Sequence, residues 1–172
     1  MTVVVETGIW QLDTARSTVA LRHKSMGGMM TVKGVFTSFT GEGEVRPDGS
    51  ALGTLTLDAA SLDTKNPKRD THLRSAQLLD VEKHPAITFT VLSAVPGDDS
   101  TVKISGELTV LGVGVPQSFT ARLTDVGPDG VTVNGELSLR DRKQFGMVWN
   151  PLGMMSGPTT VTATLRFVRA SV

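Results

Sequence analysis

The chain contains no cysteine and no excess of either charge among its 172 residues. Without cysteine, no disulfide framework and no thiolate chemistry can form. Lysine plus arginine and aspartate plus glutamate number 17 each, so the formal net charge is zero. Proteins that bind nucleic acids or anionic membrane surfaces normally carry a basic excess. We therefore expect neither nucleic acid nor a charged membrane surface as a partner.

Long apolar segments are also missing. No stretch approaches the ~20 apolar residues that a membrane-spanning helix needs, so we expect no stable membrane insertion. The first ten residues, MTVVVETGIW, contain neither a basic start nor an apolar run of signal-peptide length. This beginning predicts a cytoplasmic protein. The length and the hydrophobic content of 39% predict one globular domain, at residues 7–170.

Motifs for catalysis and for metal binding are absent from the sequence. No serine lies in a GxSxG elbow, and there is no phosphate-binding loop. The glycines between Gly106 and Gly114 lie in a strand pattern and not before a helix, which excludes a dinucleotide-binding loop. Three scattered histidines make no zinc signature. We predict no catalytic residue, no metal site and no cofactor, and hence no enzymatic activity.

Most of the chain alternates between apolar and polar residues with a period of two. Val131 and Val133, for example, alternate with Thr132 and Asn134. About eight such segments are joined mostly by short turns, which predicts antiparallel strands with one apolar face each. That face must be buried, either by closing the sheet into a barrel or by stacking two sheets. The alternation fits both architectures.

The segment from residue 61 to 89 departs from this alternation. Asn66 followed by Pro67 is typical of a helix start, and apolar residues then recur every third position from Leu73 to Leu79. This spacing predicts a short α-helix at about residues 67–79, ended by Pro85 at the latest. Its polar residues either tie the helix to nearby loops or hold the head group of a ligand.

The same segment carries a family resemblance. The residues SLDTKNPKRDTHLRS, followed by VEKHPAITF, resemble the central signature of the YceI-like, polyisoprenoid-binding family. Segments at residues 10–13, 21–23, 106–113 and 145–149 resemble the same family in the same order, so that the likeness covers about Gly8 to Val168. One departure is the pair Leu78-Leu79, where the family usually has aromatic residues. Many members carry an export signal, which is not seen here.

The resemblance implies an all-β, mainly antiparallel fold, an eight-stranded lipocalin-like β-barrel with the short helix closing one end. It also implies that the barrel binds an isoprenoid or another long-chain amphiphilic lipid, such as a quinone or a fatty-acid derivative, for transport, storage or sequestration. Two alternatives stay open from the residues: an enzyme acting on a small apolar substrate in the cavity, and a ligand-free structural or stress protein. The sequence also leaves a homodimer open.

Candidate ligand-binding residues follow from the strand phases. The predicted apolar lining consists of Val19, Leu21, Met29, Leu55, Leu57, Phe89, Ile104, Leu108, Phe119, Leu137, Met147 and Trp149. His23, Arg69 and His72 are the candidate polar contacts, although His23 fits a hydrogen-bonded core position as well. Two segments rich in glycine and methionine suit the rim of a cavity or ordinary core packing. Their candidate gating residues are Met26, Met30, Met154 and Met155.

Overall fold

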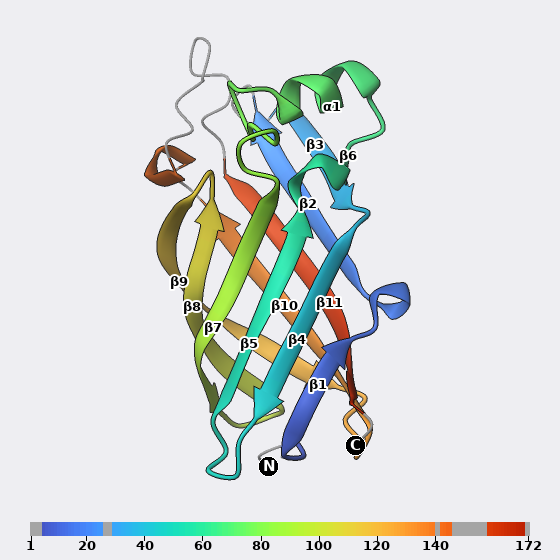
Figure 1. Ribbon diagram of the computed structural model, residues 1–172, viewed down its shortest axis with the longest axis vertical. Coiled ribbons are helices and arrows are strands. Elements are labelled where there is room, and N and C mark those ends of the chain that lie inside the picture. Colours follow the sequence, from blue (N-terminus) through green and yellow to red (C-terminus); the bar gives the residue numbers. More distant parts are fainter. Residues whose placement is uncertain (1–4, 26–28, 140–141, 146–157, 171–172) are drawn as a thin grey trace.

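The computed structural model describes residues 5–25, 29–139, 142–145 and 158–170. Antiparallel strands make up most of this part of the chain (Figure 1). They are β1 (Gly8–Leu12), β2 (Thr18–Ser25), β3 (Met30–Phe36), β4 (Phe39–Val45), β5 (Ala51–Asp58), β6 (Leu62–Asp63), β7 (Ala86–Pro96), β8 (Thr101–Val110), β9 (Val113–Thr124), β10 (Gly130–Leu139) and β11 (Thr159–Arg169).

Eight of these strands close into a barrel. The hydrogen-bonded order is β1-β4-β5-β7-β8-β9-β10-β11, and β1 pairs with β11 to complete the ring. β11 is shared along one edge: its first half pairs with β2, and its last residues pair with β1. β3 and β6 continue the sheet beyond β2. The predicted eight-stranded barrel is therefore confirmed, and the alternative of two stacked sheets is excluded.

The barrel wall bends where β7 meets β8. The register between these strands shifts between Val91 and Ser93, which is a β-bulge, and Leu92 is 64% exposed on the outside. Opposite the bulge, a Cβ on Gly106 would lie 2.3 Å from the carbonyl oxygen of Thr90. Only glycine allows this close approach, so Gly106 lets the strands coil tightly enough for closure.

The predicted helix is present but shorter than expected. α1 spans Pro67–Arg74 and lies at the end of the barrel opposite the start of β1 (Figure 1). Asn66 caps it by accepting a hydrogen bond from the Arg69 amide at 3.1 Å. After Ser75 the chain turns back, because the amide of Leu79 donates to the carbonyl of Leu73 at 2.9 Å.

This turn explains the spacing that predicted a longer helix. Leu78 is 3% exposed, and Leu73 and Leu79 pack against the core, so three of the four apolar residues of the predicted stripe are directed inward. Ala76 is exposed. The apolar positions are satisfied by a tight turn after one short helix, not by the continuous helix to residue 79 that we predicted.

Three single turns of 3₁₀-helix complete the described structure: η1 (Thr14–Arg16), η3 (Ala59–Ser61) and η4 (Arg142–Phe145). Phe145 at the end of η4 is 4% exposed and belongs to the main apolar cluster with Val19, Phe36 and Leu57. No helix in the described ranges has the length and apolar content to cross a membrane.

Candidate functional site: the barrel interior

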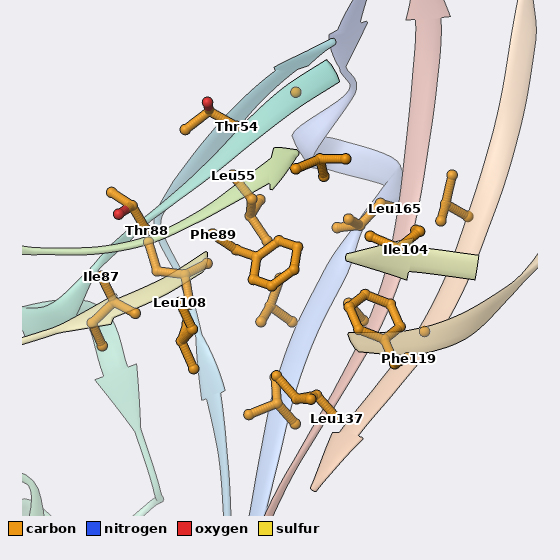
Figure 2. A pocket seen from close by; sticks show the side chains of 18 of the residues that line it. Thr54, Leu55, Ile87, Thr88, Phe89, Ile104, Leu108, Phe119, Leu137 and Leu165 are labelled. Carbon is orange, nitrogen blue, oxygen red and sulfur yellow. The ribbon is translucent and has the colours of Figure 1, made fainter. Parts of the chain in front are cut away.

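The barrel encloses a cavity of about 720 Å³. Its wall is largely aliphatic and aromatic, and Figure 2 shows side chains from several strands gathered around it. Twelve of the predicted binding residues line it: Val19, Leu21, His23, Leu55, Leu57, Arg69, His72, Phe89, Ile104, Leu108, Phe119 and Leu137. That any of them touches a ligand stays a prediction.

The register of the strands explains why these side chains share one space. Leu55 of β5 lies opposite Phe89 of β7, which in turn lies opposite Leu108 of β8. Directly paired residues project to the same side of a sheet. Ile104 is likewise paired with Phe119 of β9. Alternation along each strand and pairing across strands therefore build one continuous apolar surface.

Two aromatic rings of the cavity lining, Phe89 and Phe119, lie next to each other. The centroids of Phe89 and Phe119 are 5.6 Å apart, and the ring planes are tilted by 54°. This spacing and tilt are favourable for an aromatic pair. In Figure 2 the two rings project toward the same space.

Several lining residues escaped the prediction. Trp10, Phe36, Val131, Val161 and Phe167 follow the same alternation, so their strand phase could have found them. Thr64 and Thr159 also line the cavity. Nothing in the local sequence singles out these two threonines, because their position depends on which strands lie side by side.

One connected group of polar residues of the cavity lies at the end that α1 covers. Thr64 is 4% exposed, and both its amide and its hydroxyl donate to the carboxylate of Asp70, which is 6% exposed. Arg69 donates from Nε to the Thr64 hydroxyl at 2.9 Å and from Nη2 to the Thr64 carbonyl at 2.9 Å. The three side chains therefore form one connected network between β6 and α1.

The two candidate histidines have defined hydrogen bonds. His23 is 6% exposed, and its Nδ1 lies 2.8 Å from the hydroxyl of Thr159, its partner in the β2–β11 register. His72 Nε2 lies 2.8 Å from the side-chain oxygen of Gln77. Both histidines line the cavity.

The carboxylate of Asp63, which precedes Thr64 in the sequence, makes two contacts with Lys65. The backbone amide of Lys65 donates to Asp63 at 2.9 Å, and its ammonium group lies 3.3 Å from the same carboxylate. These hydrogen bonds lower the pKa of Asp63 below its ordinary value of 3.8. Asp63 is therefore ionised at neutral pH.

Within the described ranges, no group of three or more histidine, aspartate or glutamate residues could hold a metal ion.

The predicted methionine contacts are not found among the described residues that line the cavity. Met29 does not line the cavity, and that prediction is wrong: its side chain is 87% exposed. The inward residues of β3 are Val32 and Phe36, and Met29 lies in the turn before the strand with the opposite phase. Met30 is 49% exposed and also lies outside the lining. The remaining candidates lie outside the described residues: Met26, Met147, Trp149, Met154 and Met155.

A closed antiparallel barrel with a large apolar hollow and a polar network under a short helix defines a lipocalin-like class of protein. The YceI-like domain model matches residues 10–167, and the chain belongs to this family. The predicted resemblance is thereby confirmed.

Relatives with curated descriptions agree with this assignment. A UPF0312 protein from Ectopseudomonas mendocina is 35% identical over 105 residues, which is 59% of this chain and 54% of that protein. Protein YceI from Escherichia coli O157:H7 is 34% identical over 124 residues, which is 66% of this chain and 64% of that protein. The chain thus spans less than two thirds of the length of these relatives.

Solved structures share the fold at low sequence identity. BcnA from Burkholderia cenocepacia has a TM-score of 0.80 and 19% identity, covering 90% of this chain and 98% of that chain. A polyisoprenoid binding domain from Saccharophagus degradans has a TM-score of 0.73 and 16% identity, covering 96% and 100%. At such identities the likeness concerns the fold alone.

Proposed function

We propose that the barrel binds the hydrocarbon chain of a long-chain amphiphilic lipid, with the polar head toward the α1 end, for transport, storage or sequestration. The observation that carries the proposal is the apolar cavity of about 720 Å³. This volume lies within the range of about 300–1,000 Å³ that is typical of small-molecule sites.

The energetics favour binding of such a chain. Burying ten methylene groups contributes roughly 8 kcal/mol at about 0.8 kcal/mol each. Association costs about 4–15 kcal/mol, so a chain that fills more of the cavity is needed for tight binding. Apolar walls discriminate weakly between chains of similar size. The candidate ligands are therefore a class: polyisoprenoids, quinones and fatty-acid derivatives, the first of which is supported by the description of the Saccharophagus degradans domain.

The alternatives receive less support. His23 is hydrogen-bonded to the hydroxyl of Thr159, which supports a structural or ligand-contacting role. A ligand-free structural protein would be expected to fill its interior with its own side chains, whereas this barrel is hollow. A cytoplasmic location, a single domain at residues 7–170 and a homodimer stay predictions.

Mass spectrometry of bound material tests the proposal. The protein is purified without detergent and extracted with organic solvent, and the extract is analysed for stoichiometric lipid. A matched pair of variants controls for surface-bound lipid: Ala163→Trp obstructs the cavity that Ala163 lines, and Thr40→Trp places the same ring at an exposed position of β4 that does not line the cavity. Lipid in wild type and Thr40→Trp but not in Ala163→Trp is expected. No lipid in any of them, and none taken up on incubation with farnesol or oleate, would overturn the proposal.

A further inference from the structure

One guanidinium group is fixed in position at the helix end of the cavity. Arg69 donates two hydrogen bonds of 2.9 Å to Thr64, from Nε to the hydroxyl and from Nη2 to the carbonyl. Thr64 is itself held by its burial and by the two hydrogen bonds that it donates to the buried Asp70 carboxylate. The orientation of the guanidinium is thus set before any ligand arrives, which lowers the entropic cost of binding to it.

Arg69 has donors to spare. A guanidinium carries five N–H groups, and the two hydrogen bonds to Thr64 use one on Nε and one on Nη2. Within the described part of the chain, no further hydrogen bond or ion pair of Arg69 is formed. The remaining Nη1–Nη2 edge is the one that receives a carboxylate or phosphate with two parallel hydrogen bonds. Arg69 is also the only lysine or arginine among the described residues that line the cavity.

We propose that Arg69 selects lipids with an anionic head, a carboxylate or a phosphate monoester, over neutral lipids of the same chain length. The inference rests on the proposed function and adds the chemical class of the head group. Asp70 lies next to Arg69 in sequence and offsets its charge, so selection depends on the fixed donor geometry more than on net charge. The apolar neighbours Leu73 and Leu78 also line the cavity and strengthen hydrogen bonds made beside them.

Calorimetric titration with three ligands of similar size tests the proposal: oleate, oleyl alcohol and farnesyl phosphate. Wild type is expected to bind oleate at least about tenfold more tightly than oleyl alcohol, as one charged bidentate contact implies. Arg69→Gln should remove this preference, weakening oleate about tenfold and the alcohol less than about twofold. Farnesyl phosphate distinguishes the two anionic head groups. A site that accepts only a carboxylate would bind farnesyl phosphate no more tightly than oleyl alcohol.

Arg74→Gln is the matched control. Arg74 ends the same helix, is exposed and does not line the cavity, so this variant makes the same charge change without touching the site. It should leave all three affinities unchanged. Equal losses for oleate and oleyl alcohol in Arg69→Gln, or no preference in wild type, would overturn the role of Arg69 while leaving lipid binding intact. If wild type binds none of the three ligands, the proposed function itself fails.

An independent observation concerns the wall between β9 and β10. β9 pairs with β8 through ten residue pairs, and β10 pairs with β11 through ten, but β9 and β10 share only three. The last of these pairs is Asn134 with Arg122. Toward the α1 end both strands are described, and they continue without further registered pairs. This seam is the least hydrogen-bonded junction between two long strands of the ring.

Two hollows meet at this seam. A groove of about 320 Å³ on the outside shares Gly135, Glu136 and Ala163 with the lining of the interior cavity. From the inside, the Phe119 ring covers the junction: a Cβ on Gly135 would lie 2.9 Å from Phe119 Cε2. Rotation of this ring away from the glycine would break no backbone hydrogen bond.

We infer that the β9–β10 seam is a lateral entrance through which lipid reaches the cavity, with Phe119 as its gate; this inference also rests on the proposed function. A disulfide across the seam tests it, because the chain has no other cysteine. Thr120→Cys with Glu136→Cys continues the register two residues beyond Arg122 and Asn134. If the disulfide does not form, a short bis-maleimide linker closes the seam between the same two cysteines.

Stopped-flow exchange of a fluorescent fatty acid is then measured with the seam closed and open. Closure should slow association and dissociation by at least about tenfold and restore both on reduction, with little change in equilibrium affinity. Ser105→Cys with Ser118→Cys is the control, since these residues are directly paired across the fully bonded β8–β9 junction and their hydroxyls lie 3.0 Å apart. Unchanged exchange with the seam closed would place the entrance elsewhere, and absence of equilibrium binding would instead refute the proposed function.

Discussion

Removing the Asp70 carboxylate is expected to destabilise the protein more than any surface charge would. The carboxylate is 6% exposed and accepts hydrogen bonds from both the amide and the hydroxyl of Thr64, which is 4% exposed. Asp70→Ala therefore leaves two buried donors without a partner. Each unsatisfied buried donor costs about 1–3 kcal/mol, and we expect a loss of about 3 kcal/mol in the free energy of unfolding.

The loss can be measured by thermal and urea unfolding. For a domain of this size, 1 kcal/mol corresponds to a shift in Tm of about 2–4 °C, so Tm should fall by roughly 6–12 °C. Asp48→Ala is the matched control. Asp48 also accepts two hydrogen bonds from one residue, Ser50, but in an exposed turn. Its removal should change the stability by less than about 0.5 kcal/mol.

A double-mutant cycle identifies the cause. Thr64→Val removes the hydroxyl donor, so Asp70→Ala should cost less in that background than in wild type. Residues in one hydrogen-bonded network couple by about 0.5–3 kcal/mol. Additive effects of the two substitutions, or a loss for Asp70→Ala no larger than for Asp48→Ala, would refute the view that the Thr64–Asp70 contact anchors α1 to the barrel.

Three further predictions concern the cavity and the charges. Ala163→Trp should occupy part of the cavity and weaken oleate binding by at least tenfold, measured by titration, because the new ring takes the space of the chain. His23→Leu should weaken binding of a polar-headed isoprenoid more than of a plain alkane; equal changes would remove His23 from the head-group site. Arg16 donates a hydrogen bond to the Asp13 carboxylate at 2.6 Å, and this contact lowers the pKa of Asp13 below 3.8. The contact therefore stabilises the folded protein above about pH 4, and this stabilisation is lost as the pH falls through the lowered pKa of Asp13. Arg16→Gln should raise that pKa in an NMR titration, and an unchanged value would contradict the assignment.

Residue alternation determined the strands and their inward faces. Leu55, Phe89 and Leu108 line the cavity because side chains on a strand alternate, and this rule needs no knowledge of the neighbours. Asn66 and Pro67 likewise determined where α1 begins, because capping is a local interaction. Its end was missed, since the hydrogen bond from the Leu79 amide back to the Leu73 carbonyl competes with a further helical turn only once Leu78 can be buried in the barrel.

Only the tertiary structure decided between a barrel and two stacked sheets. Both architectures bury the same alternating residues, and the difference lies in the pairing of β1 with β11, from Trp10 with Arg169 to Leu12 with Phe167. Such pairs are more than 150 residues apart and leave no local signal. The burial of Asp70 was decided in the same way: its position on α1 suggests a solvent-facing residue, and it is stabilised inside only because the fold places the amide and hydroxyl of Thr64 beside it. Local periodicity sets which side of an element is apolar, whereas a cavity and its polar contacts depend on which distant elements meet.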